Sequence, residues 1–204
     1  ALVAISATLI DYAFKAEAAQ HIGDREDLMR FFGLFYTATA ILTFIVQSSL
    51  GRRSLQKLGL DGTIALQPGA IVLLGILAAA VQRLWSAVLL RAIETVISNS
   101  LFRSGYELLY TPVSPEQKRP TKTIIDVGCQ RLGDAAGSGI TLLILAVAAP
   151  LAPTIVVVVA IAAAIVALAI FAPWISWHDP VTMAIDERVL ADWEANELAA
   201  FIAH

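Results

Sequence analysis

Cysteine and histidine are scarce in this sequence, and their scarcity excludes several kinds of site. Cys129 is the only cysteine, so the chain has no internal disulfide and no cysteine-rich metal site. Because Cys129 lies in an apolar segment, we expect it to pack rather than to react. The three histidines, His21, His178 and His204, are scattered along the chain, which argues against a metal site built from histidines. We therefore expect no bound metal.

Charged residues are also few, at 15% of the 204 residues, whereas 58% are hydrophobic and the mean hydropathy is +0.74. Soluble domains are usually about 45–50% apolar, so the composition predicts a membrane protein. The net charge of −3 hides an uneven arrangement, because basic residues gather in two short segments and acidic residues in the tail. Such a pattern indicates membrane topology rather than nucleic-acid binding.

Signatures of soluble enzymes are absent as well. The glycine-rich run GDAAGSG (133–139) lacks the Lys-Ser/Thr pair of a phosphate-binding loop. Arg103, Tyr106 and Glu107 have no neighbouring nucleophile and base. The opening ALVAISATLI has no initiator Met and no basic residue, unlike a signal peptide. We expect a piece of a longer protein that is not an enzyme and binds no cofactor.

Six hydrophobic segments dominate what the sequence does contain, and a bilayer-spanning helix needs roughly 20 residues. They cover residues 1–20, 29–50, 63–81, 86–111, 123–149 and 153–171. Pro153 suits the first turn of a helix, and Pro68 is tolerable within one whose neighbours satisfy the freed carbonyl. The sequence predicts an all-α membrane protein with six transmembrane helices over residues 1–176.

The hydrophilic connections indicate an orientation. Residues 21–29 form a polar loop in which Asp24 can cap the next helix, while 51–62 and 112–123 are basic loops. The positive-inside rule places both basic loops, and with them both ends of the chain, in the cytoplasm. Residues 177–204 predict an acidic amphipathic helix, which is either a solvated terminal helix or the start of a cytosolic domain.

Seven charged residues lie within or beside the hydrophobic segments and are candidates for a functional site. A charge inside a bilayer is costly unless it is paired or faces water, so it marks a transport pathway or a packed polar network. The candidates are Asp11, Lys15, Arg103, Glu107, Asp126, Arg131 and Asp134.

Helical spacing groups these candidates. Asp11 and Lys15 are four residues apart and can pair. Arg103 and Glu107 share one face of their segment with Asn99, which we expect to look toward a cavity. Arg91 and Glu94 fall on a different face of the same segment, which we expect to hold it to a neighbouring helix.

The segment over residues 123–149 carries a second polar group. Asp126, Gln130 and Asp134 recur every four residues and form a stripe, and Arg131 is close enough in sequence to be the partner of Asp134. In the same segment, residues 133 and 137 are both glycine, a spacing that lets another helix approach closely. All these charges are open to two interpretations, as structural ion pairs or as parts of a transport pathway.

Four strings carry a resemblance to a known family: LIDYAFKAEA (9–18), FFGLFYTATAILTF (31–44), YELLYTP (106–112) and KTIIDVGCQRLGDAAGSG (122–139). Over residues 1–175 the chain resembles the ATP/ADP translocases, and within them the bacterial relatives. The resemblance implies the C-terminal six-helix half of a twelve-helix transporter, related to the major facilitator superfamily, in a bacterial inner membrane.

The resemblance also assigns residues. Asp11 matches an acidic transport-site position, Lys15 the basic residue after it, and Asp126 the acid of the K-x-x-I-D-V string. Asp134 departs from the family, which has a basic residue in its L-G-K string. An acid at this position would repel a polyphosphate.

The leading hypothesis is a secondary transporter for an anionic, nucleotide-like metabolite, with the lipid bilayer and the N-terminal half of the same transporter as partners. Arg103, Lys15 and Arg131 would attract the anion, and the four acids, Asp11, Glu107, Asp126 and Asp134, would gate or couple. The alternative is a non-transporting membrane scaffold or sensor coupled to a cytosolic domain. Charged side chains that converge on a water-filled cleft favour transport, and closed pairs favour the scaffold.

Overall fold

The computed structural model describes residues 1–81, 83–103 and 124–171, and this part of the chain is helical throughout, apart from short connections. The elements are α1 (Leu2–His21), α2 (Arg25–Ala80), α3 (Leu84–Ile97), the π-helices η1 (Ser98–Phe102) and η2 (Ile124–Cys129), α6 (Gln130–Ala148), the 3₁₀ turn η3 (Ala149–Leu151) and a helix over residues 152–171. The all-α prediction is confirmed for the described residues. The tail over residues 177–204 and the basic loop over 112–123 lie outside them.

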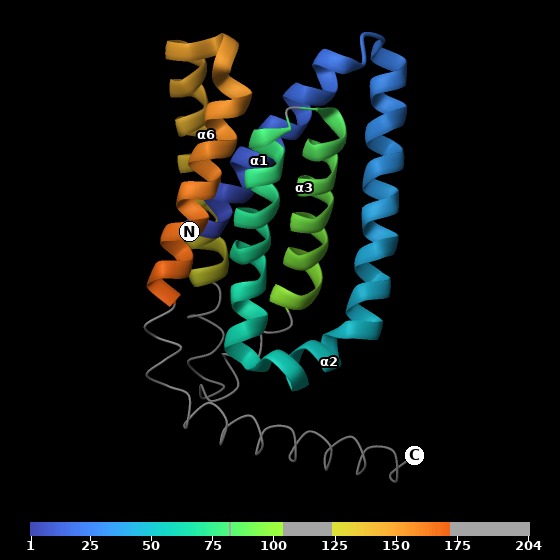
Figure 1. The fold of residues 1–204 in the computed structure, drawn as a ribbon, viewed down its shortest axis with the longest axis vertical. Coiled ribbons are helices and arrows are strands. Elements are labelled where there is room, and N and C mark those ends of the chain that lie inside the picture. Colours follow the sequence, from blue (N-terminus) through green and yellow to red (C-terminus); the bar gives the residue numbers. More distant parts are fainter. Residues whose placement is uncertain (82, 104–123, 172–204) are drawn as a thin grey trace.

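Three stretches of the described chain are long and apolar enough to cross a membrane: Arg25–Ser49, Gly62–Ala80 and Val127–Phe171. The third is folded in two by η3, so that α6 and the helix over 152–171 run antiparallel (Figure 1). The segments that we expected at 123–149 and 153–171 match this hairpin closely, and Pro153 lies in the first turn of its second helix. The helices α1 and α3 do not meet the same criteria of length and hydropathy.

The connection between α1 and α2 is shorter than the polar loop expected over residues 21–29. Helix α2 already begins at Arg25, and the carboxylate of Asp24 accepts a hydrogen bond from the backbone N–H of Asp27 at 3.3 Å. Glu26 and Asp27 lie in the first turn, where their negative charges suit the positive end of the helix dipole. The predicted Asp24 cap is therefore confirmed, and the polar residues after it belong to the helix.

The basic loop expected over residues 51–62 is wrong, because the backbone there remains helical and α2 runs without interruption for 56 residues. This segment contains several good helix formers and no proline. Figure 1 shows that α2 bends sharply in this region, so that its first arm (25–49) and its second arm (62–80) point in opposite directions. Pro68 sits within the second arm and is fully buried.

Helix α1 lies at the centre of the bundle (Figure 1). The main core cluster joins Leu9, Ile10 and Ala13 of α1 to residues of the second arm of α2, of α3 and of the last helix: Ile71, Ala78, Leu90, Val156, Val157, Ala160 and Ala164. The first arm of α2 stands to one side and exposes many apolar side chains, among them Leu34, Ile41 and Phe44. It is fixed to α1 at one point, where Phe14 packs against Phe31, Phe32 and Phe35.

Candidate functional site

A row of charged and polar side chains connects α1, α3 and the second arm of α2 inside this apolar body. Asp11 lies at its centre: one carboxylate oxygen is 2.6 Å from Lys15 Nζ and the other is 3.0 Å from Arg91 Nη2. Arg91 donates through Nη1 to Glu94 at 2.7 Å, and Gln67 donates to the other oxygen of Glu94 at 3.4 Å. We call these five residues the charge network.

Local helix geometry sets the two ends of the charge network. Asp11 and Lys15 are one turn apart on α1, as the sequence predicted, and Arg91 and Glu94 are three residues apart on α3. The link between the two pairs, Asp11 to Arg91, joins residues far apart in the sequence. Arg91 and Glu94 therefore hold α3 to a neighbouring helix, as we expected of that face.

Burial differs along the charge network. The side chain of Glu94 is 3% exposed, those of Arg91 and Asp11 are 17% and 24% exposed, and that of Lys15 is 52% exposed. The network thus runs from a buried carboxylate to an accessible ammonium group. Within the described part of the chain, two buried atoms of the network, Gln67 Oε1 and Arg91 Nε, have no hydrogen-bond partner.

A second polar contact lies between α1 and α6, where the two helices approach closely. A Cβ added at Gly133 would lie 2.5 Å from Ala4 Cβ, and one added at Gly137 would lie 2.9 Å from Thr8 Cβ. The close approach predicted from this glycine spacing is confirmed. It brings Thr8 within hydrogen-bonding distance of Asp134, whose carboxylate accepts from Thr8 Oγ1 at 3.2 Å and from Gln130 Nε2 at 3.4 Å.

Arg131 is not the partner of Asp134, contrary to our expectation. Their spacing would allow a pair, but the carboxylate of Asp134 contacts Thr8 of α1 and Gln130 of α6 instead. Arg131 is exposed and forms no ion pair with any of the described residues, while Asp134 is half-buried against α1. Cys129, two residues before Arg131, is exposed as well. The described residues therefore do not bury it, although we expected it to pack.

The remaining predicted residues are only partly placed. Arg103, directly after η1, and Asn99 within it are both exposed, whereas Glu94 is buried. All of Glu107 and the side chain of Asp126 lie outside the described residues. Of the seven predicted residues, the structure therefore brings together Asp11 and Lys15, and it places Asp134 against Thr8, one turn before Asp11 on α1.

Sequence reasoning missed Gln67, which is 1% exposed and donates to Glu94. An uncharged amide in an apolar segment beside a proline was its only signal. Arg91 and Glu94 were noticed and expected to hold their segment to a neighbouring helix, but nothing in their local sequence shows that Arg91 reaches Asp11. The described residues contain no group of acidic, histidine or cysteine side chains that could hold a metal ion.

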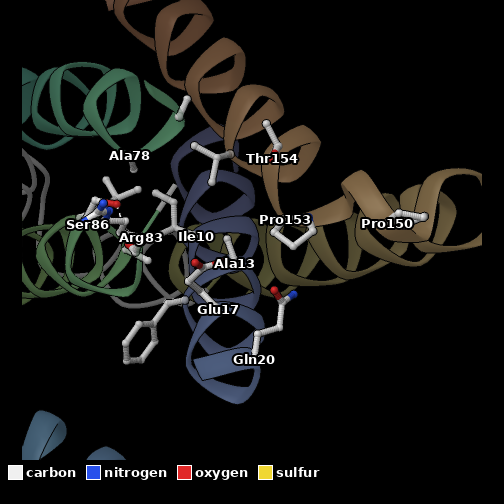
Figure 2. Close-up of a pocket in the computed structure, with 15 residues that line it drawn as sticks. Ile10, Ala13, Glu17, Gln20, Ala78, Arg83, Ser86, Pro150, Pro153 and Thr154 are labelled. Atoms are coloured by element: carbon white, nitrogen blue, oxygen red, sulfur yellow. Dashed lines mark hydrogen bonds between the residues drawn. The ribbon is translucent and has the colours of Figure 1, made fainter. Parts of the chain in front are cut away.

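A cavity of about 130 Å³ opens near the end of the bundle where α1 ends and α3 begins, lined by Glu17, Gln20, Arg83 and Ser86 together with apolar side chains (Figure 2). Pockets that enclose small ligands usually measure roughly 300–1,000 Å³, so this one is too small for a nucleotide. A wider, open groove with mostly apolar walls runs along α3, past Leu84, Val88 and Leu89. Its lining suits apolar groups rather than a charged metabolite.

Comparison with known proteins adds a family to this geometry. Residues 2–178 match the family described as TLC ATP/ADP transporter. Over 167 residues the chain is 25% identical to ADP,ATP carrier protein 1 of Chlamydia pneumoniae, in an alignment that covers 72% of this chain and 32% of that carrier. The chain thus spans about a third of the length of this relative. No solved structure matches it.

Proposed function

This chain belongs to the TLC ATP/ADP transporter family, and from that premise we propose that it is part of a secondary transporter that exchanges an anionic metabolite across a bacterial inner membrane. The family and the long apolar helices make it a multi-pass membrane protein. The family is one of transporters rather than enzymes, and ATP and ADP are the first candidate substrates, by the name of the matched carrier.

The observation that carries this proposal is the charge network. Two cations and two carboxylates cross the apolar interior, and one cation, Lys15, is half-exposed. Charges in such surroundings are costly and commonly line a substrate or ion path. A half-exposed ammonium group beside a second cation offers an anion two positive charges at one place.

We further propose that the six hydrophobic segments form six spans, as one half of a twelve-helix transporter of the major facilitator type. The substrate would then bind between this half and the N-terminal half of the same protein. The small size of the cavity near the end of the bundle, about 130 Å³, supports this proposal, because a nucleotide would need a second wall. The many apolar side chains on the first arm of α2 require cover from lipid or from that other half.

The alternative, a scaffold or sensor coupled to a cytosolic domain, draws support from the buried end of the charge network. Glu94 is closed off by Arg91, Gln67 and Thr95, as expected of a structural pair. The exposed end at Lys15 favours transport. The proposal of transport rests on that end of the network.

Uptake of radiolabelled ATP and ADP tests the proposal. Intact bacterial cells that express the complete protein are compared with cells that express a Lys15→Gln variant at the same level. We expect uptake by the unchanged protein, faster after preloading with unlabelled nucleotide, and little uptake by the variant. Equal, background uptake by both, with the protein present in the membrane, would favour the scaffold.

A further inference from the structure

The geometry around Asp11 assigns a role to Arg91 beyond packing. We propose that Arg91 is a substrate-binding residue, which together with Lys15 takes an anionic oxygen-bearing group such as a phosphate or a carboxylate. Asp11 is then the internal competitor that occupies the two cations while the anion is absent. This inference rests on the proposed transport of an anion and names the pair of cations that receives it.

The first argument is the arrangement of the two cations around Asp11. Each carboxylate oxygen has its own cation, Lys15 Nζ at 2.6 Å from Oδ2 and Arg91 Nη2 at 3.0 Å from Oδ1. The two oxygens of Asp11 therefore occupy the positions that two oxygens of a phosphate or carboxylate group would take. The planar guanidinium of Arg91 can hold Glu94 through Nη1 and offer Nη2 to one oxygen of the anion, while Lys15 takes another oxygen.

The second argument is the unequal burial of the two carboxylates that share Arg91. Glu94 is almost fully buried and is held by Gln67 and Thr95 as well as by Arg91. Asp11 has its other partner, Lys15, on the accessible side. Glu94 therefore fixes one edge of the guanidinium, while the other edge faces the carboxylate that an incoming anion reaches first.

The third argument is the balance of charge. Lys15 and Arg91 are positive, and Asp11 and Glu94 are negative, so the charge network is neutral as it stands. When an anion displaces Asp11 from the cations, it meets two positive charges of which only one is balanced by Glu94. Interactions between charges are strong in apolar surroundings, so the competition between Asp11 and the anion sets the affinity.

The fourth argument is the incomplete pairing of the network. Buried polar groups that serve stability alone are normally hydrogen-bonded. Arg91 Nε and Gln67 Oε1 are buried without a partner among the described residues. If Asp11 gives way to another anion, the charge network has one set of hydrogen bonds with the anion bound and another without it. Atoms that are unpaired in one of these states are expected in such a network.

The test measures the equilibrium binding of ATP and of inorganic pyrophosphate to the complete protein in detergent. We expect Asp11→Asn to tighten binding of the anion by about tenfold, which corresponds to about 1.4 kcal/mol, and Arg91→Gln to weaken it by at least as much. Arg91→Lys should keep part of the affinity, because one charge remains but a single ammonium group does not reproduce the two Nη contacts, one to Glu94 and one to the anion.

Two controls separate this role from general effects of charge and folding. Glu17→Gln removes one negative charge from α1 without touching Arg91, and it should leave binding unchanged. Thermal melting of each variant identifies loss of folding. The variant Asp11→Asn should melt at a lower temperature than the unchanged protein and still bind the anion more tightly, a combination that a purely structural ion pair does not produce.

The outcomes distinguish this inference from the proposed function. Binding of ATP that is unchanged or weakened by Asp11→Asn in a folded protein overturns the role of Arg91 and Asp11 and leaves nucleotide transport standing. Binding of pyrophosphate with the expected pattern, without binding of ATP, overturns the nucleotide and supports the anion site. Binding of neither anion by any folded variant overturns both.

Discussion

At the scale of single residues, the side chain of Glu94 depends strongly on its neighbours, because it is a buried carboxylate in the last turn of α3. Its partners are Arg91, Gln67 and Thr95. Breaking a buried ion pair by removing one member leaves the other charge uncompensated in apolar surroundings, and this costs more than the pair contributes. The stability of the three-helix contact therefore rests on Glu94 even though transport is proposed to depend on the other end of the network.

Replacing Glu94 by Gln should lower the free energy of unfolding by about 3 kcal/mol. The expected change is measured by denaturant titration of the complete protein in detergent. Glu26→Gln is the matched control: Glu26 pairs with Arg30 at 2.6 Å, but both side chains are more than two-thirds exposed. Its loss should change stability by less than about 0.5 kcal/mol. A similar change in the free energy of unfolding for the two variants would show that the buried pair of Arg91 and Glu94 stabilises the protein no more than an exposed pair does.

Asp134 calls for a different substitution, since its contact is a hydrogen bond across the α1–α6 interface. Asp134→Asn keeps an oxygen that accepts from Thr8, so transport should be retained and stability should fall by about 1 kcal/mol or less. Asp134→Lys should abolish transport, because a cation cannot accept from Thr8 or from Gln130. Tighter binding of ATP by Asp134→Lys, with transport retained, would instead place this residue at the polyphosphate.

At the scale of elements, the contact between α1 and α6 depends on having no side chain at two positions. Gly133 faces Ala4 and a backbone carbonyl, and Gly137 faces Thr8 and the carbonyl of Ile5. Atoms of the main chain have little room to move aside, unlike the tip of a flexible side chain. This interface also sets how far Thr8 lies from Asp134 and therefore positions the polar contact beside the charge network.

Gly133→Ala should destabilise the protein by about 1–3 kcal/mol, the usual cost of overpacking. Gly139→Ala on the same helix is the control, since a Cβ there meets nothing within 4 Å. It should be neutral or stabilising by up to about 1 kcal/mol, because alanine favours helix over glycine. The comparison is made by thermal melting. A Gly133→Ala protein as stable as the Gly139→Ala protein would mean that α1 and α6 pack less closely.

The helices that coincide with apolar runs could be predicted well from the sequence. The contacts between these helices could not. The hairpin over 123–149 and 153–171 followed from hydropathy and Pro153, because both signals are local. Residues 51–62 were expected to be a loop on account of their basic charges, but the helix continues through them and α2 bends there instead (Figure 1). The link from Asp11 to Arg91 depends on how α1 and α3 pack, and no local pattern in the sequence encodes that contact.

For the molecule as a whole, the breaks after α1, after α2 and after α6 lie at one end of the bundle (Figure 1). The bend of α2 lies at the opposite end, where the helix over residues 152–171 also ends (Figure 1). This alternation agrees with the proposed topology, in which the basic segment over 51–62 is cytoplasmic. Ser54 within that segment is buried against Thr63, so a probe for labelling is better placed at the exposed Ser49.

Single cysteines at Gly23 and Ser49, in a background with Cys129 replaced by Ser, should report opposite sides of the membrane. We expect a membrane-impermeant thiol reagent added to intact cells to label position 23 and to spare position 49 until the cells are opened. Labelling of position 49 from outside, with position 23 protected, would invert the proposed orientation. Disruption of the cells serves as the control that both thiols are reactive.

The pairing of Asp11 with Lys15 also bears on how the protein is made. Helix α1 is synthesised long before α3, so Arg91 does not yet exist when α1 leaves the ribosome. Insertion of a lone aspartate at the centre of a helix costs roughly 2.5–3.5 kcal/mol on the scale set by the insertion machinery. Because Lys15 lies one turn away at 2.6 Å, α1 carries the countercharge of Asp11 within itself, and in the six-span topology that we propose this pair would lower the cost of inserting α1. The contact with Arg91 is made only when α3 arrives, so the charge network is completed later than the pair within α1.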